Sequence, residues 1–245
     1  KEVIPYQWEA LNDRVEGAAP SYAMRNFRVA AKKNQERKEL GAAFQGFETL
    51  SEELDSLEDR FYGCVFQDSD FSKWIEAVGY SLNQHPDPEL ERIADGAIDL
   101  VCAAQQEDGY LDTYYIINGK NKIFTNLRDH HELYCMGHLI EGAVAYEATG
   151  KDKLLKAAAR FADYAAAHFG TEEGKKKGYP GHEIAEMALV RLYDVTGEQR
   201  YLELSKYFIE ERGKRPYYFD KEHPEEVKKK PDGLRYEYNQ AHKPV

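Results

Sequence analysis

Residues 132–168 read ELYCMGHLIEGAVAYEATGKDKLLKAAARFADYAAAH, which is the pattern of two amphipathic helices joined by a short turn. In the first half Leu133, Met136 and Ile140 recur at helical spacing, and in the second half Leu154 and Phe161 do the same. The Thr-Gly step between the halves is typical of a helix C-terminal stop. We therefore expect an αα-hairpin over this stretch.

The turn of this hairpin recurs further along the chain. The segment YEATG at 146–150 aligns with YDVTG at 193–197, and Leu155 and Phe161 then align with Leu202 and Phe208. A repeat of this length with two helices in each unit is typical of an array of αα-hairpins. An upstream helix pair follows the same plan, with a Pro-Asp-Pro turn at 86–88.

The periodicity predicts six helices, over Asp70–Gln84, Glu89–Gln105, Glu132–Ala148, Lys153–His168, Glu183–Val195 and Arg200–Glu211. Such an array can stay open, as in a helical-repeat binding module, or close into an α/α toroid, which is an enzyme scaffold. We predict an all-α fold in which the αα-hairpin array forms about half of an (α/α)6 toroid. An irregular N-terminal segment precedes it.

The expected organisation divides the chain at residue 65. Residues 1–65 form the N-terminal segment, and residues 66–245 form a partial barrel of three hairpins. Within the first segment, residues 31–60 are dense in charge and poor in large apolar side chains. This composition predicts an insertion or a solvated helical excursion rather than core.

The composition excludes several classes of protein. The chain has 245 residues, and its 33 Lys+Arg against 44 Asp+Glu give a formal net charge of −11, which disfavours nucleic acid as a partner. No apolar run approaches the roughly 20 residues that a membrane span needs. The cysteines Cys64, Cys102 and Cys135 form no CxxC pair, so a reducing cytoplasm is the predicted location.

Polar residues stand at the N-terminal ends of the first helix of each pair. Because these helices run parallel in any such array, their N-termini share one rim, where free N–H groups can orient a polyhydroxylated ligand. The rim collects Gln67, Asp68, Asp70, Asp129, His131 and His182. The alternative for the acidic residues is a role as helix N-caps. The aromatic loop 108–115 is expected on the opposite rim or the outer wall.

No metal site is predicted in this chain. His131 and His138 share a helix face with Cys135 between them, but their spacing of seven is not the i, i+4 spacing that brackets one ion. His138 is interpreted as a core histidine, because it lies on an apolar face. The lysine run 175–177 is interpreted as solvated loop charge.

Several long motifs resemble glycoside hydrolase family 127, the β-L-arabinofuranosidases. They are VIPYQW at 3–8, VFQDSD at 65–70 with KWIEA at 73–77, QQEDGYL at 105–111, NLRD at 126–129 with HELYC at 131–135 and GH at 137–138, and GYPGH at 178–182. They are ordered along nearly the whole chain, except over 31–60. The resemblance implies an (α/α)6 barrel followed by β-sandwich domains, and retaining, exo-acting hydrolysis of terminal β-L-arabinofuranosides.

The resemblance also implies which residues carry the chemistry. In that family a zinc-held cysteine thiolate is the nucleophile and a glutamate is the general acid/base, and both come from the second half of the barrel, expected beyond Val245. Cys64, Cys102 and Cys135 do not match the zinc-ligand positions. Sugar-binding histidines of the family match His131 and His182, and the family's inner-helix entries support Gln67 and Asp68 as residues that line the site.

These inferences give a set of expectations. The partner is an arabinofuranosyl oligosaccharide or glycoconjugate; this chain alone binds no zinc, lacks a catalytic residue and is inactive. Exposed inner helices favour self-association. The alternatives are another α/α-toroid carbohydrate enzyme, of the unsaturated glucuronyl hydrolase or sugar epimerase type, a helical-repeat binding protein, or a half-ring completed by a partner subunit.

Overall fold

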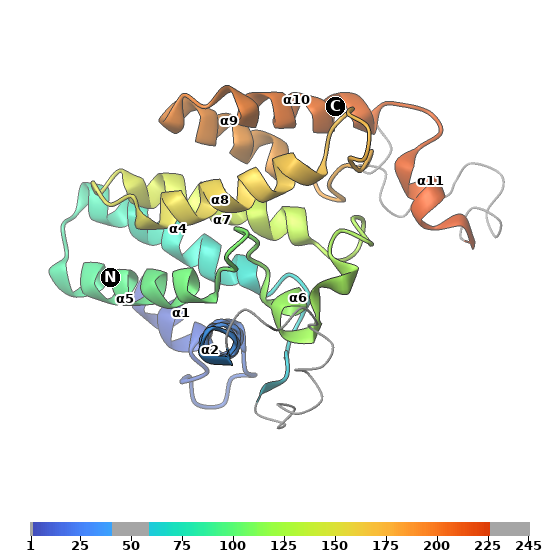
Figure 1. The fold of residues 1–245 in the computed structure, drawn as a ribbon. Coiled ribbons are helices and arrows are strands. Elements are labelled where there is room, and N and C mark those ends of the chain that lie inside the picture. The colour runs from blue at the N-terminus through green and yellow to red at the C-terminus, as the bar shows by residue number, and fades with distance from the viewer. Residues whose placement is uncertain (1, 41–58, 226–245) are drawn as a thin grey trace.

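Three antiparallel helix pairs form the body of the molecule (Figure 1). They are α4 (Asp68–Gln84) with α5 (Pro88–Ala104), α7 (Glu132–Glu147) with α8 (Lys153–His168), and α9 (Ala185–Thr196) with α10 (Gln199–Arg212). The computed structural model describes residues 2–40 and 59–225. Within these ranges it has no strand, only an isolated bridge between Phe169 and Lys176. The prediction of an all-α array of hairpins is confirmed.

Local sequence signals set the ends of these helices. The Asp87 carboxylate accepts hydrogen bonds from the backbone N–H groups of Glu89 and Leu90, and Pro88 occupies the first helical position of α5. Gly197 ends α9 with φ +73°, a left-handed conformation that glycine adopts without a Cβ clash. These signals explain why sequence periodicity located the pairs.

The first helices of the three pairs lie side by side, in the order α4, α7, α9 (Figure 1). At the α4–α7 contact, a Cβ on Gly142 would lie 2.6 Å from the Ser72 carbonyl oxygen, so only glycine permits this approach. Arg191 of α9 pairs with the buried Glu141 of α7 and donates to the Tyr80 hydroxyl of α4 at 3.0 Å. This polar link joins α4, α7 and α9.

The N-terminal segment differs from the irregular structure expected of it. It forms α1 (Val3–Leu11) and α2 (Ala23–Leu40). Trp8 of α1 stacks on Trp74 of α4 with ring centroids 4.6 Å apart, and the Trp74 indole donates to the Ile4 carbonyl at 3.1 Å. This packing supplies the stabilisation that short helices lack by themselves.

Of the two interpretations of residues 31–60, an insertion or a solvated helical excursion, the helical one fits the first part of the segment, but this part is packed rather than solvated. Residues 31–40 are the second half of α2, which packs against α5. The buried Asn34 amide donates to the carbonyls of Ala103, Ala104 and Gln105 at 2.8–3.1 Å, so it satisfies carbonyls at the C-terminus of α5. The charge density suggested exposure to solvent, whereas the polar side chain of Asn34 is buried against another helix. Residues 41–58 lie outside the described residues, and the division at residue 65 stays a prediction.

The loops between hairpins gather at the right-hand end of the molecule in Figure 1. The loop between the first two hairpins contains the short helices α6 (Thr113–Asn118) and η2 (Lys120–Lys122), and α11 (Tyr218–Glu222) follows the third hairpin. The lysine run is not simply solvated: Lys175 donates to the Ala166 carbonyl at 3.0 Å and Lys177 to the Gly170 carbonyl at 2.9 Å, which satisfies carbonyls near the end of α8. None of the helices in the described ranges has the length and apolar character to cross a bilayer.

Candidate functional site

His131 and His182 meet at the rim where α7 and α9 begin. Their ring centroids are 4.9 Å apart with an interplanar angle of 41°. His131 directly precedes α7, and His182 lies in the loop that leads into α9. Both rings are only partly buried, so they remain accessible from the rim. The structure therefore brings together the two histidines that the sequence placed at equivalent positions of successive hairpins.

The loop before α7 holds the His131 ring through one of its nitrogens. His131 has φ +59°, and its Nδ1 lies 2.5 Å from the Asp129 carbonyl oxygen. Because a carbonyl oxygen can only accept, Nδ1 donates to it, which leaves Nε2 as the ring nitrogen for a ligand. The Arg128 guanidinium in turn holds the Asp129 carboxylate through two hydrogen bonds of 2.9 Å. A hydroxyl group approaching the rim can form a hydrogen bond with Nε2.

The loop that carries His182 presses directly against the loop before His131. The Gly181 N–H donates to the Leu127 carbonyl at 3.2 Å, and a Cβ on Gly181 would lie 2.3 Å from the Arg128 carbonyl oxygen. Burial lowers the pKa of His182, and electrostatic interactions with His131 and Arg212 lower it further, against the opposing effect of Glu183. The neutral form of His182 is therefore favoured, which suits hydrogen bonding to an uncharged ligand.

Tyr134 joins this pair into a larger cluster. Its ring centroid lies 5.6 Å from that of His131, 5.5 Å from that of His182 and 4.5 Å from that of His138. Lys73 of α4 donates to the Tyr134 hydroxyl at 2.9 Å. We call His131, His182, Tyr134 and His138 the rim cluster. Sequence reasoning missed Tyr134, although its spacing of three from His131 places it on the same helix face.

His138 is not a core histidine as predicted. It is half-buried, packs edge-on against Tyr134, and its buried Nδ1 has no hydrogen-bond partner among the described residues. Burial, followed by the nearby Lys73 charge, lowers its pKa to about 4. The apolar residues next to His138 on α7 suggested a core position, but the residue itself faces the rim cluster.

Gln67 lies at the start of α4 with its amide group engaged locally. Its Oε1 accepts from the Cys64 N–H at 3.1 Å, and its Nε2 donates to Asp70 at 2.5 Å. The neighbouring Phe66 comes closer to the cluster, because its ring centroid is 5.4 Å from that of His131 and its side chain is exposed. The structure thus shows an aromatic wall at this side of the cluster, and a ligand role for Gln67 stays a prediction.

Asp68 is buried and holds the following inter-hairpin loop. It accepts from the Thr113 N–H at 2.7 Å and from the Thr113 hydroxyl at 2.5 Å. Burial raises its pKa to about 6 in spite of these hydrogen bonds. Both oxygens are engaged with Thr113, which indicates a supporting position; direct contact between Asp68 and a ligand stays a prediction.

This contact also corrects the expected place of the aromatic loop 108–115. The loop lies at the same rim as Asp68, not on the opposite rim or the outer wall. The reason is connectivity: a loop between hairpins joins the end of a second helix to the start of the next first helix, and both lie at that rim. The rings of Tyr110 and Tyr115 are buried, so they support the rim from below.

Two further carboxylates hold the segment between α5 and α7. Glu132 accepts from the Tyr110 hydroxyl at 2.6 Å and from the Phe124 N–H at 2.8 Å. Glu222 of α11 accepts from the Leu127 N–H at 2.8 Å. Burial raises the pKa of Glu132 to about 8. These carboxylates serve the backbone that presents His131.

The described residues offer no metal site, and the thiols of Cys102 and Cys135 are not activated. They contain no group of three or more His, Cys, Asp or Glu side chains that could hold a metal ion. Burial raises the pKa of the Cys102 thiol to about 11 and that of the Cys135 thiol well above its usual range. A thiol nucleophile needs the opposite shift.

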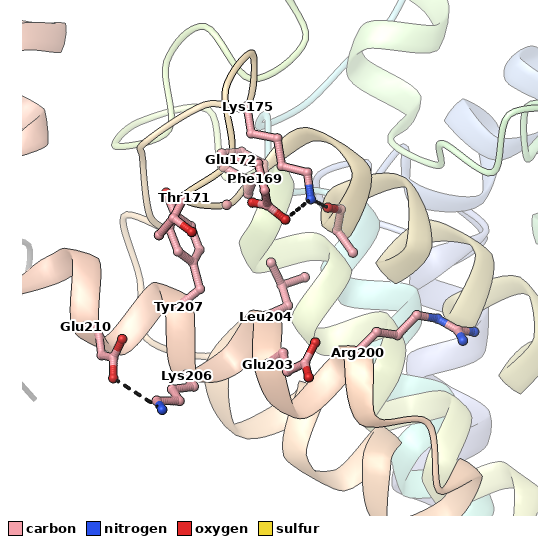
Figure 2. Close-up of a pocket in the computed structure, with 12 residues that line it drawn as sticks. Phe169, Thr171, Glu172, Lys175, Arg200, Glu203, Leu204, Lys206, Tyr207 and Glu210 are labelled. Carbon is pink, nitrogen blue, oxygen red and sulfur yellow. Dashed lines mark hydrogen bonds and ion pairs between the residues drawn. The ribbon is translucent and has the colours of Figure 1, made fainter.

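A separate cavity of about 400 Å³ lies between α8 and α10 (Figure 2). Two ion pairs lie along its wall, Lys175 with Glu172 at 3.1 Å and Lys206 with Glu210 at 3.7 Å. No member of the rim cluster lines it. It is not part of the candidate site.

Comparisons with known proteins point to one family. The sequence model described as "Beta-L-arabinofuranosidase, GH127 catalytic domain" matches residues 4–245. A non-reducing end β-L-arabinofuranosidase from Bifidobacterium longum subsp. longum is 43% identical over 227 residues, which are 91% of this chain and 33% of that protein. The chain thus spans about a third of the length of this curated relative.

Two solved structures show the same fold. The crystal structure of a GH127 β-L-arabinofuranosidase from Geobacillus stearothermophilus T6 superposes with a TM-score of 0.82 at 50% identity, over 99% of this chain and 35% of that one. A GH127 β-arabinofuranosidase superposes with a TM-score of 0.73 at 31% identity, over 99% of this chain and 32% of that one.

Proposed function

The chain belongs to glycoside hydrolase family 127, the β-L-arabinofuranosidases, and from this membership we propose that it forms the sugar-binding part of an enzyme that releases L-arabinose from β-L-arabinofuranosides. The observation that carries the proposal is the pairing of His131 with His182 at the rim, with ring centroids 4.9 Å apart. Both residues lie in the motifs that resemble the family's sugar-binding segments.

The rim cluster supplies the two kinds of contact that a furanose ring requires. A neutral imidazole such as that of His182 has one donor and one acceptor for hydrogen bonds to sugar hydroxyls and no charge to desolvate. His131 presents its Nε2, since its Nδ1 is engaged by the Asp129 carbonyl. The Tyr134 and Phe66 rings provide apolar faces beside them. Aromatic faces pack against the C–H groups of a sugar while the hydroxyls turn toward polar partners.

We propose that the nucleophile and the general acid/base come from outside the described residues. The raised pKa values of Cys102 and Cys135 argue against a thiolate at either position. Because the described residues do not fit a zinc site, none of them is assigned to zinc. Zinc in the whole protein, and a cysteine nucleophile held on it, remain part of the proposal.

The proposed substrate is a terminal β-L-arabinofuranosyl residue on an oligosaccharide or glycoconjugate, in line with the name of the curated relative. We also propose a cytoplasmic location, supported by Cys64, Cys102 and Cys135, which are all free thiols. Self-association is supported by exposed apolar side chains such as Met187 and Val195 on α9.

A substrate panel tests the proposal. The whole protein, with zinc and reductant present, is offered the 4-nitrophenyl glycosides of β-L-arabinofuranose, α-L-arabinofuranose and β-L-arabinopyranose. We expect release of 4-nitrophenol from the first alone, and we expect the sugar released in the presence of methanol to be the methyl β-L-arabinofuranoside. Hydrolysis of another glycoside in preference would contradict the substrate assignment. Sugar binding without hydrolysis of any of them would favour a binding module.

A further inference from the structure

Arg212 is a completely buried arginine directly behind the loop that carries His182. It belongs to the last turn of α10, and its exposed fraction is 0%. Burying a guanidinium is costly unless its donors are matched by acceptors. Acceptors for this guanidinium come from the segment 180–186, which covers the loop before α9 and the first turn of that helix.

The guanidinium contacts this segment and the preceding Tyr179 at four points. Nη2 donates to the Pro180 carbonyl at 2.7 Å and to the Glu186 carboxylate at 3.1 Å. Nη1 lies 3.4 Å from the Glu183 carboxylate. The guanidinium carbon also lies 4.8 Å from the centre of the Tyr179 ring. The contacts therefore bracket His182 on both sides along the chain.

We propose that Arg212 is a positioning residue, which sets the place of the His182 imidazole against His131 by fixing the loop at Pro180 and at Glu183. The inference rests on the proposed function, since His182 is taken there as a sugar-binding residue. Gly181 packs against Leu127 and Arg128 on the side of the loop before α7, while Arg212 contacts the loop from the side of α10. Between these two supports the loop has little room to move.

The arrangement needs arginine in particular. A guanidinium presents several donors in a fixed plane, so one side chain can reach a carbonyl and two carboxylates while it lies on an aromatic ring. A lysine at this position would keep the charge near Glu183 and Glu186, but its single ammonium group could not reproduce the fork or the contact with Tyr179. Arg212→Lys therefore tests whether the positive charge is sufficient or whether the shape of the guanidinium is needed.

The test is a double-mutant cycle in the whole protein with a β-L-arabinofuranoside as substrate. Arg212→Met and Arg212→Lys are made in the wild type and in the His182→Ala variant. Arg200→Met is the matched control, because Arg200 lies at the other end of α10 in an exposed ion pair with Asp163. Thermal unfolding of every variant is recorded beside kcat and KM.

In the wild type we expect Arg212→Met to lower kcat/KM by about tenfold or more, mainly through KM, because misplacing a polar contact loses its binding contribution. Arg212→Lys recovers part of this loss, and Arg200→Met costs less than about twofold. In the His182→Ala background Arg212→Met costs less than about threefold, because the residue through which Arg212 acts is gone.

Equal losses of kcat/KM in both backgrounds would overturn the proposal, since they would show a general structural role. Unchanged activity of Arg212→Met in the wild type would overturn it as well. If Arg212→Met fails to fold, the losses of kcat/KM caused by Arg212→Lys in the two backgrounds are compared instead. If the His182→Ala change itself has no effect, the proposed function of the rim cluster fails and the role of Arg212 fails with it. A weak Arg212 effect beside a strong His182 effect refutes the Arg212 role alone.

Discussion

Asp68 accepts two hydrogen bonds from Thr113, one from its backbone N–H at 2.7 Å and one from its hydroxyl at 2.5 Å. The pair joins the first turn of α4 to the start of α6, and all of these groups are buried. A helix N-terminus and an aromatic loop are thereby fixed to each other beneath the rim.

Removing this link should destabilise the fold. We expect Asp68→Ala to lower the free energy of unfolding by about 2–4 kcal/mol, because the buried Thr113 N–H is left without its acceptor. Asp99→Ala, which removes an exposed partner of Lys153, should cost about 0.5 kcal/mol or less. Denaturant unfolding of both variants checks the difference. A similar small loss for both would contradict a supporting role of Asp68.

Glu132 should make stability depend on pH. Burial raises its pKa from an ordinary value of 4.5 to about 8, so between these values the folded chain keeps a proton that the unfolded chain has released. Raising the pH across this range therefore favours unfolding. Glu132→Gln removes this titration. The difference in Tm between the variant and the wild type should therefore increase in favour of the variant by on the order of 5 °C from pH 5 to pH 8. Parallel pH profiles of the two Tm values would contradict the prediction.

His138 should stay neutral over the working range of most enzymes. Its pKa of about 4 reflects burial first and the charge of Lys73 second. NMR titration of the imidazole signals should show His138 unchanged above pH 5, and Lys73→Met should move its midpoint upward. The folded pKa lies below the unfolded one, so His138 favours folding as the pH rises from about 4 to about 6.5. A midpoint above 6 in the wild type would contradict this account.

Gly181 should be irreplaceable in the loop before α9. In Gly181→Ala the new Cβ would lie 2.3 Å from the Arg128 carbonyl oxygen, which forces the two histidine-bearing loops apart. We expect kcat/KM to fall by about tenfold and the stability by about 1–3 kcal/mol. Gly96→Ala on α5 is the control: nothing lies within 4 Å of its Cβ position, so about 0.5–1 kcal/mol of added stability is expected. Equal behaviour of the two variants would show that the loops can separate freely.

The hairpins could be predicted because their signals are local. Apolar periodicity and the Thr-Gly turns located three helix pairs within a few residues of their observed ends, as for Glu183–Val195 against the observed Ala185–Thr196. The helix α6 has no such signal. It has six residues, and it depends on the Asp112 cap and on Asp68, which lies far away in the sequence. Helices that rest on distant partners cannot be found from periodicity.

The same distinction holds for the site. His131 and His182 were found because both precede first helices, and the connectivity of the array brings those ends together. His138 was misread, since the pattern of α7 shows which residues are apolar but not which neighbours face each position. Arg212 gave no signal, because nothing in its local sequence shows that its partners are Pro180 and Glu186. Buried polar contacts between distant segments require the structure.

The central claim is that the histidine pair at the rim binds the arabinofuranosyl ring. The most direct measurement is kcat/KM of the whole protein on 4-nitrophenyl β-L-arabinofuranoside for the wild type, His131→Ala, His182→Ala and the control His85→Ala, whose side chain is exposed after α4. We predict losses of about tenfold or more for each rim histidine, an unchanged Tm, and wild-type activity for the control. Wild-type kcat/KM in both His131→Ala and His182→Ala would contradict the claim.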